Sequence, residues 1–237
     1  MRAIVLSRLD FREADQLITF YTKEQGKITV LATGIKKITS KNSPLLGLGA
    51  LVEAEIISGK EWQRLGSVET IKNNLCVESS NPSGLLVMSA LTFVNSVIKE
   101  DETDPVLFTI IFDWLYFLST NKSVSEILLL AFFVRISAHL GWAPVLDKCV
   151  LCNTVQTKEF FSVSRGGLVC ANCRLSLPVG EVVLPFNQIW GDKWRALLTD
   201  DLVELNDWPK TAGLKPFFGL VKQFIEFHTE KLLPFDW

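Results

Sequence analysis

The spacing of hydrophobic and polar positions changes once along this chain of 237 residues. Up to about residue 78, apolar residues form short runs rich in Val, Ile, Thr and Phe that glycines separate, a pattern typical of β-strands. From about residue 85 onward, apolar residues recur at helical spacing and form longer runs. The pattern therefore predicts an α+β protein in which the strands come first and the helices follow.

The first part of the chain contains five predicted strands, which suit a small closed barrel. They cover residues 3–6, 17–22, 27–32, 51–58 and 65–71. Gly26-Lys27 and Gly59-Lys60 have the composition of turns between consecutive strands. The oligonucleotide-binding (OB) barrel has five strands and binds its ligand on one face and on the neighbouring loops. Strand number alone indicates this fold only weakly.

Helices are predicted for most of the remaining chain. They lie near residues 85–95, 105–119, 125–139, 187–198 and 215–233. The first three are apolar over most of their circumference, which predicts that they are buried among one another. We interpret Leu85, Met88 and Leu91 as core residues, Pro105 as a first-turn proline and Ser125 as an N-cap. The apolar runs at 106–118 and 127–140 are shorter than the roughly 20 residues that a bilayer requires, so no membrane span is expected.

Four of the five cysteines form two C-x-x-C pairs, Cys149 with Cys152 and Cys170 with Cys173. A spacer of two residues lets a tight turn direct both sulfur atoms of a pair toward one ion, and two such pairs complete a tetrahedron. A set of four thiolates leaves no position for water or substrate, so the spacing predicts one structural Zn²⁺ ion. Gly166 and Gly167 precede the second pair and can supply a positive φ there.

Disulfides or a redox pair are the alternatives to the metal site. The first ten residues mix charged and apolar side chains, unlike a secretory leader, so we expect a cytoplasmic protein whose thiols stay reduced. A thioredoxin-like pair would not need a second C-x-x-C. A zinc deaminase would need an H-x-E motif, but Leu140 and Gly141 follow His139. The predicted organisation is a barrel domain at 1–80 and an all-α domain at 81–237, with a zinc-finger insertion at 148–177.

Positive charge is concentrated near the start of a chain whose net charge is −2. Residues 1–41 contain eight Lys and Arg against four Asp and Glu, so an anionic partner should meet this part. The candidate residues for contact with nucleic acid are Arg8, Arg12, Lys23, Lys27, Lys36, Lys37, Lys41, Trp62 and Arg64. The lysines are expected to follow a phosphate backbone, and Trp62 could stack on a base. The alternative is a solvated lysine loop and a tryptophan that covers the barrel end.

The residues resemble a known family, the RecO proteins of bacterial DNA repair. One match runs through Ala3, Val5-Leu6, Arg8, Arg12-Glu13-Ala14-Asp15, Leu17, Thr22, Gly26-Lys27 and Gly34. The other runs through Leu140-Gly141-Trp142-Ala143-Pro144, Leu146, Cys149, Cys152 and the eight residues from Gly166 to Cys173. The sequence departs from the family pattern in a lysine segment that is less basic, in a C-terminus without a basic tail, and in Asn153, where a glycine is usual.

The resemblance implies an OB barrel followed by a helical domain with a zinc finger, and a role without catalysis. It implies binding of single- and double-stranded DNA and annealing of complementary strands. It also implies the partners RecR and single-stranded DNA-binding protein (SSB), loading of RecA, and a bacterial cytoplasmic protein associated with the nucleoid. The alternative is an adaptor that docks RecR or SSB and contacts DNA little. An enzyme is not expected, because the sequence has no Ser-His-Asp order, no G-x-x-x-x-G-K and only two histidines.

Overall fold

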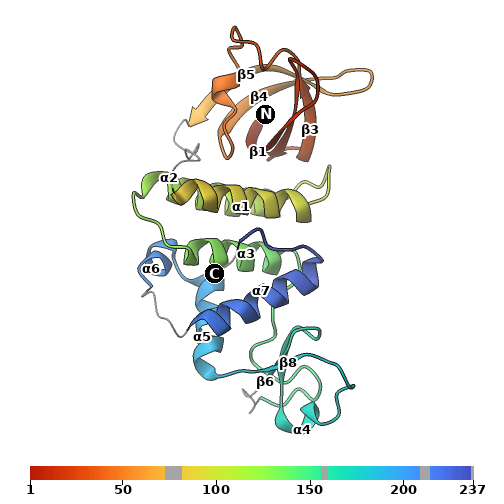
Figure 1. The fold of residues 1–237 in the computed structure, drawn as a ribbon, viewed down its shortest axis with the longest axis vertical. Helices are drawn as coiled ribbons and strands as arrows, with labels where there is room; N and C mark the ends of the chain where they lie inside the picture. The colour runs from red at the N-terminus through yellow and green to blue at the C-terminus, as the bar shows by residue number, and fades with distance from the viewer. Residues whose placement is uncertain (73–81, 156–159, 209–213, 236–237) are drawn as a thin grey trace. The chain divides into compact units, whose positions relative to one another are not determined.

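The structure is a computed structural model of the chain, which divides into two compact units, Met1–Val124 and Ser125–Trp237. The description covers residues 1–72, 82–155, 160–208 and 214–235. The predicted boundary between residues 80 and 81 lies outside these described ranges. The first unit contains the barrel together with two helices, and the second contains the other helices (Figure 1). The four paired cysteines belong to the second unit.

The first unit contains the predicted five-stranded closed barrel. Its strands are β1 (Arg2–Asp10), β2 (Gln16–Thr22), β3 (Gly26–Ala32), β4 (Leu51–Ile57) and β5 (Arg64–Lys72). They are paired in the order β1-β2-β3-β5-β4, and β4 closes the barrel by pairing with β1. All pairs are antiparallel except β3 with β5, where Leu31 is opposite Arg64. The strand prediction is confirmed, although β1 extends four residues beyond the predicted end.

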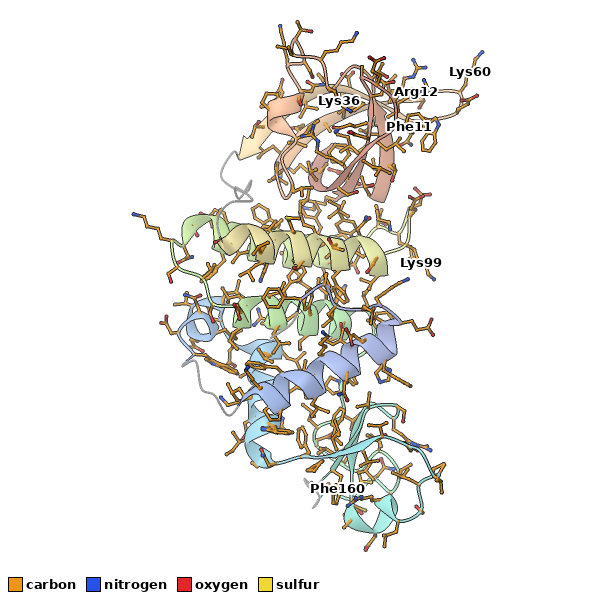
Figure 2. All side chains as sticks on the ribbon, viewed as in Figure 1. Phe11, Arg12, Lys36, Lys60, Lys99 and Phe160 are labelled. Atoms are coloured by element: carbon orange, nitrogen blue, oxygen red, sulfur yellow. The ribbon has the colours of Figure 1, made fainter. Side chains whose placement is uncertain are left out.

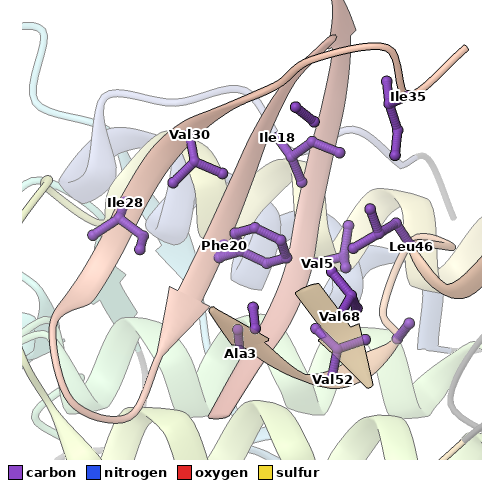
Figure 3. Packing of buried hydrophobic residues seen from close by; sticks show 13 residues of the cluster. Ala3, Val5, Ile18, Phe20, Ile28, Val30, Ile35, Leu46, Val52 and Val68 are labelled. Atoms are coloured by element: carbon purple, nitrogen blue, oxygen red, sulfur yellow. The ribbon is translucent and has the colours of Figure 1, made fainter. Parts of the chain in front are cut away.

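Alternate residues of the strands fill the barrel, as the two-residue period of a strand requires. Phe20 lies in the middle of this cluster, and Val5, Ile18 and Val30 surround it (Figure 3). Each of these four side chains is fully buried. Because the core holds the strands from within, the outward-facing residues and the loops at the barrel ends are available for other roles.

Two helices complete the first unit, α1 (Pro82–Val97) and α2 (Pro105–Thr120). Helix α1 packs against β1 of the barrel. Asp104 caps α2 by accepting hydrogen bonds from the amides of Val106 and Leu107, and Pro105 occupies the first turn as predicted. The predicted buried face of α1 was wrong for two residues. Leu85 and Met88 are exposed, because the side of α1 that is buried carries Leu86, Val87, Ala90 and Leu91 instead.

The helices of the second unit surround a central, almost fully buried helix. This is α3 (Ile127–His139), which packs against α5 (Gln188–Thr199), α6 (Leu202–Asn206) and α7 (Lys215–Thr229). The Ser125 prediction is off by one position, since the N-cap is Glu126, and the Ser125 hydroxyl accepts a 3.4 Å bond from the amide of Ile127. None of the helices in the described ranges combines the length and apolar character needed to cross a bilayer.

The paired cysteines belong to a small segment between α3 and α5. It comprises β6 (Phe160–Ser162), β7 (Gly167–Val169), the short helix α4 (Ala171–Arg174) and β8 (Val183–Pro185). The sheet has the order β7-β6-β8. Phe161 of β6 is fully buried, and its ring lies 5.1 Å from Trp194 of α5 and 5.8 Å from Phe224 of α7. This aromatic cluster anchors the cysteine-bearing segment to the helices.

Candidate nucleic-acid interface and candidate metal centre

Two loops at one end of the barrel bring an aromatic side chain each to the same place. Phe11 lies in the β1–β2 loop and Trp62 in the β4–β5 loop, and their ring centroids are 6.0 Å apart. Each side chain is 39% exposed, so both rings retain a face toward solvent. The β1–β2 loop is held by its own backbone, because the amides of Phe11 and Arg12 both donate to the carbonyl of Asp15. The pair is therefore an ordered aromatic surface.

A pocket of about 570 Å³ lies between these loops and carries an excess of positive charge. Its charged lining residues are Arg12, Lys60, Glu61 and Arg64. The Arg12 guanidinium lies 5.0 Å from the centre of the Phe11 ring, a cation–π arrangement that keeps the charge beside the aromatic surface. Figure 2 shows Phe11 and Arg12 close together on the barrel, with Lys60 extending from the neighbouring loop. Aromatic faces beside cations suit a ligand with flat rings and anionic groups.

The lysine segment that follows β3 is attached to the same end of the barrel. The Gly34 amide donates to the Asp15 carboxylate over 2.7 Å, and the Lys36 amide donates to the carbonyl of Ala14 over 3.0 Å. Ile35 is buried beneath the segment. These bonds connect the segment to the β1–β2 loop, the loop that carries Phe11 and Arg12.

The three lysines of this segment differ in their surroundings. The Lys36 ammonium forms a 2.8 Å ion pair with Asp10, and its hydrogen bond lowers the pKa of that carboxyl. Because both side chains are well exposed, the pair contributes little to folding. Lys37 and Lys41 are exposed, and within the described part of the chain neither ammonium has a hydrogen-bond or ion-pair partner. Lys23, in the β2–β3 turn, is exposed as well.

Two further predicted contact residues, Arg8 and Lys27, bond to other parts of the protein. The Arg8 guanidinium donates to the Gln16 side chain over 2.8 Å and to the carbonyls of Ser43 and Leu46, which ties β1 to the loop before β4. The Lys27 ammonium donates over 2.9 Å to the carbonyl of Asn95, near the C-terminal end of α1. Burial lowers the pKa of Lys27, although Glu100 opposes the shift. The geometry of both cations favours a structural use over contact with DNA.

The structure also brings in two residues that the sequence prediction did not include. Phe11 and Lys60 lie at the pocket, Phe11 through its contact with Trp62 and Lys60 as part of the lining. The sequence contained only a weak indication that these two residues take part in binding. A lone Phe between two charged residues and a lysine in a turn are both common on protein surfaces. Only the closure of the barrel places the two loops side by side.

The four paired cysteines converge in the second unit. All four sulfur atoms lie within 4.8 Å of one another, and the Sγ atoms of Cys152 and Cys170 are 3.8 Å apart. A disulfide would require a separation of about 2.05 Å, whereas sulfur atoms about 2.3 Å from one tetrahedral zinc ion are ~3.8 Å apart. The spacing of the thiols therefore fits a metal ion.

The backbone of the segment directs amide groups toward the sulfur atoms. The amide of Cys170 donates to the sulfur of Cys149 over 3.4 Å, and the amide of Cys173 donates to the sulfur of Cys170 over 3.3 Å. Asn153 has φ 60°, so it tolerates the left-handed conformation where the family pattern has glycine. Gly166 has φ 70°, which confirms the predicted positive φ at that position, but Gly167 does not have a positive φ. Gly167 is needed for space instead, since a Cβ there would lie 2.6 Å from Cγ1 of Val150. The hydrogen bonds from the amides of Cys170 and Cys173 to sulfur favour the thiolate form of the cysteines, which metal binding needs.

The protonation of the thiols reflects their crowding. Hydrogen bonding with Thr154 lowers the pKa of Cys152 to about 6, while hydrogen bonds that the Cys173 thiol makes to Cys170 and Cys152 raise the pKa of Cys173 to about 12. Four thiolates this close repel one another unless a cation lies among them. A divalent ion would remove that repulsion, and this set of four sulfur donors, with no carboxylate or histidine, suits a soft or borderline metal.

Comparisons with known proteins give consistent results for both units. Residues 1–74 match the family model "Recombination protein O N terminal", and residues 84–188 match "Recombination protein O C terminal". The chain is also similar to a protein of Desulforamulus reducens named "DNA repair protein RecO", with 25% identity over 235 residues. That alignment covers 98% of this chain and 90% of the relative. The barrel and the four-cysteine segment both lie within the matched regions.

Proposed function

This chain belongs to the RecO family of DNA repair proteins, and from that premise we propose that its barrel binds DNA through the pocket between the β1–β2 and β4–β5 loops. The residues that would make contact are Phe11, Arg12, Lys60, Trp62 and Arg64, extended by Lys36, Lys37 and Lys41. The observation that carries the proposal is the aromatic pair of Phe11 and Trp62 beside three cations. Stacked bases and neutralised phosphates need this combination.

The proposed contacts do not depend on base sequence. Aromatic rings accept any base, and lysine and arginine side chains contact the phosphate backbone that all sequences share. A protein that anneals complementary strands requires such indifference, because the bases must stay available for pairing. We therefore assign this chain a mediator role without catalysis, in which it binds single- and double-stranded DNA and anneals complementary strands.

The second unit would supply the scaffold and the protein partners. The proposed ion is one Zn²⁺, held by Cys149, Cys152, Cys170 and Cys173, and it would act in folding only, since four thiolates leave no open position. RecR and SSB are the proposed partners, with RecA loading as the outcome, on the strength of the family assignment. We further propose a functional division into a DNA-binding part at 1–80 and a helical part at 81–237.

Binding to a fluorescent single-stranded oligonucleotide at increasing salt concentration tests the proposal. If the three cations of the pocket and the three lysines all contact phosphates, the slope of log K against log salt is about −4, since each contact on a single strand contributes about −0.7. Trp62→Ala should weaken binding by about 5- to 150-fold, the equivalent of about 1–3 kcal/mol for one stacked base, and leave the slope unchanged. Arg64→Ala should reduce the steepness by about 0.7.

Two control variants distinguish the pocket from the rest of the surface. Phe227→Ala removes an aromatic side chain that is 54% exposed on α7, and Lys99→Ala removes an exposed cation outside the pocket. Neither should change affinity by more than about twofold, by analogy with solvated surface positions. Absence of single-strand binding, or binding that salt does not weaken, would refute the proposal and favour the adaptor alternative, in which the chain docks RecR or SSB with little direct contact to DNA.

A further inference from the structure

The connection between α1 and α2 places a run of acidic residues on the outside of the barrel. Glu100, Asp101, Glu102 and Asp104 lie within five positions of one another. Glu100 pairs with Lys27 of β3 in a parallel bridge, and the amide of Asp101 donates to the Lys27 carbonyl over 3.0 Å. The acidic connection therefore runs along β3, one of the two strands that form the binding face of an OB barrel.

Several contacts hold this acidic connection in place. The carbonyl of Glu102 lies so close to Gly26 that a Cβ there would be 2.1 Å from the oxygen. The Tyr21 hydroxyl donates to the carbonyl of Asp104 over 3.3 Å. The Thr29 hydroxyl donates to the Glu100 carboxylate over 3.4 Å. The backbone of the connection is thus held on the barrel surface, while the side chains of Glu100 and Asp101 remain exposed.

Trp62 separates two pockets of opposite charge. The pocket of about 570 Å³ on one side is lined by Arg12, Lys60 and Arg64 against the single acid Glu61. The pocket of about 410 Å³ on the other side is lined by Leu17, Ile28, Thr29, Gln63, Glu100 and Asp101, and has no cation in its lining. Lys27, the neighbouring cation, directs its ammonium to the carbonyl of Asn95. A polyanion would meet attraction on one side of Trp62 and repulsion on the other.

We propose that Glu100 and Asp101 form an electrostatic boundary that confines a bound DNA strand to the basic side of Trp62. The inference rests on the proposed function and specifies the path of the strand. Phosphates that continue past Trp62 onto β2 and β3 would approach two exposed carboxylates, which is unfavourable over distances within the Debye length of about 8–10 Å. The strand therefore leaves the pocket toward the β1–β2 loop and the lysine segment attached to it.

The boundary has a measurable consequence for site size. The number of nucleotides that one OB barrel occludes ranges from about 4 to about 16, depending on the protein and the binding mode. A strand confined to one side of Trp62 should occlude a number near the lower end of this range. Wild-type protein should therefore gain little affinity once an oligonucleotide exceeds the short site. Nucleotides beyond those that the pocket and the lysine segment can hold would have to pass the carboxylates or remain in solvent.

The test is the double variant Glu100→Gln, Asp101→Asn, measured with a series of oligo-dT lengths from 4 to 16 nucleotides. Glutamine can still accept the Thr29 hydroxyl, and asparagine tolerates the φ of 61° at position 101. At low salt the variant should bind the longest oligonucleotide about three- to tenfold more tightly than wild type, and the ratio should fall toward one for the shortest. The gain should disappear at high salt.

A control variant with the same change in net charge distinguishes the effect of where the two carboxylates lie from the effect of net charge. Glu53→Gln, Glu69→Gln removes two exposed carboxylates that face each other across β4 and β5, away from both pocket linings. The affinity of this control variant relative to wild type should be close to one and should be the same for every oligonucleotide length. Hydrogen exchange of β3 amides monitors folding, and Glu100→Gln alone serves if the double variant unfolds.

The outcomes separate this inference from the proposed function. If wild-type protein binds no oligonucleotide, the proposed function itself fails. If wild-type binding is salt-sensitive but the Glu100 and Asp101 variants match the Glu53 and Glu69 control at every length, the boundary is refuted and the binding face stands. A ratio that increases with length only for the Glu100 and Asp101 variants supports the boundary.

Discussion

The barrel interface and the cysteine cluster are built in opposite ways. The barrel surrounds a continuous hydrophobic cluster centred on Phe20, and its candidate binding residues lie outside that cluster. The cysteine-bearing segment has three strands of three residues each, and two of its four candidate ligands are buried within it. Cys149 and Cys170 are buried, whereas Arg12 and Lys37 are exposed.

Because of this difference, residues that bind and residues that stabilise the fold are separate in the barrel but not in the cysteine-bearing segment. A surface residue of the barrel can change without affecting the core, because outward-facing side chains contribute little to the stability of a closed barrel. A thiol of the cluster is different, because a segment this small buries little apolar surface and would depend on the proposed metal ion for much of its stability. We therefore expect substitutions at the barrel loops to change affinity and substitutions at the cysteines to change structure.

The largest expected effect is the loss of the proposed metal ion. Removal of zinc by a chelator, or Cys149→Ser, should remove on the order of 10 kcal/mol of metal-coupled folding free energy from the segment. Hydrogen exchange should then show loss of protection in β6 and β7, while β1 to β5 keep theirs. The affinity for single-stranded DNA should stay within about twofold, because the barrel has its own core.

Lys148→Ala is the matched control for the metal experiment. Lys148 is exposed and adjacent to Cys149 but contributes no sulfur, so its loss should leave the protection of β6 and β7 intact. Elemental analysis that finds no zinc, together with melting that ignores chelator, would contradict the metal assignment. Loss of barrel protection after chelation would contradict the separation of the two regions.

An intermediate effect is expected at Gly26, where the barrel meets the acidic connection. Gly26→Ala should destabilise the first unit by about 2–4 kcal/mol, because the residue has φ 70° and its new methyl group would collide with the backbone carbonyl of Glu102. Gly34→Ala is the control, since Gly34 has φ 68° but only the flexible Lys37 side chain nearby. Hydrogen exchange of β2 and β3 amides measures the difference, and equal losses in the two variants would rule out the close approach as the cause.

The smallest effect is expected in the lysine segment. Lys37→Ala should weaken single-strand binding about two- to fivefold and reduce the steepness of the salt dependence by about 0.7, the value for one phosphate contact. The free energy of unfolding should not change, because the Lys37 side chain is exposed. Fluorescence anisotropy at increasing salt measures both the affinity and the slope of its salt dependence, and Lys99→Ala is the control variant. An unchanged slope would remove Lys37 from the proposed interface.

Short-range spacing determined much of this protein. Short runs rich in Val, Ile, Thr and Phe, separated by glycines, predicted the five barrel strands, because β-branched and aromatic side chains suit the pleated, half-buried surface of a sheet. The two C-x-x-C pairs predicted the thiol cluster, because two intervening residues allow a tight turn to aim both sulfurs at one point. The helices α2 and α3 followed from apolar periodicity and, for α2, from the proline at its first turn.

Tertiary structure decided which side chains meet across the fold. Phe11 and Trp62 are 51 positions apart in the sequence, and barrel closure alone brings their rings together. The docking of α1 on the barrel turned Leu85 and Met88 outward and gave Lys27 a carbonyl partner. The same docking set Glu100 beside Thr29. Local periodicity carries no information on the distances between side chains of different elements, because these distances depend on how the elements pack. The sequence pattern allows several faces of an element to be buried, and the packing selects one of them.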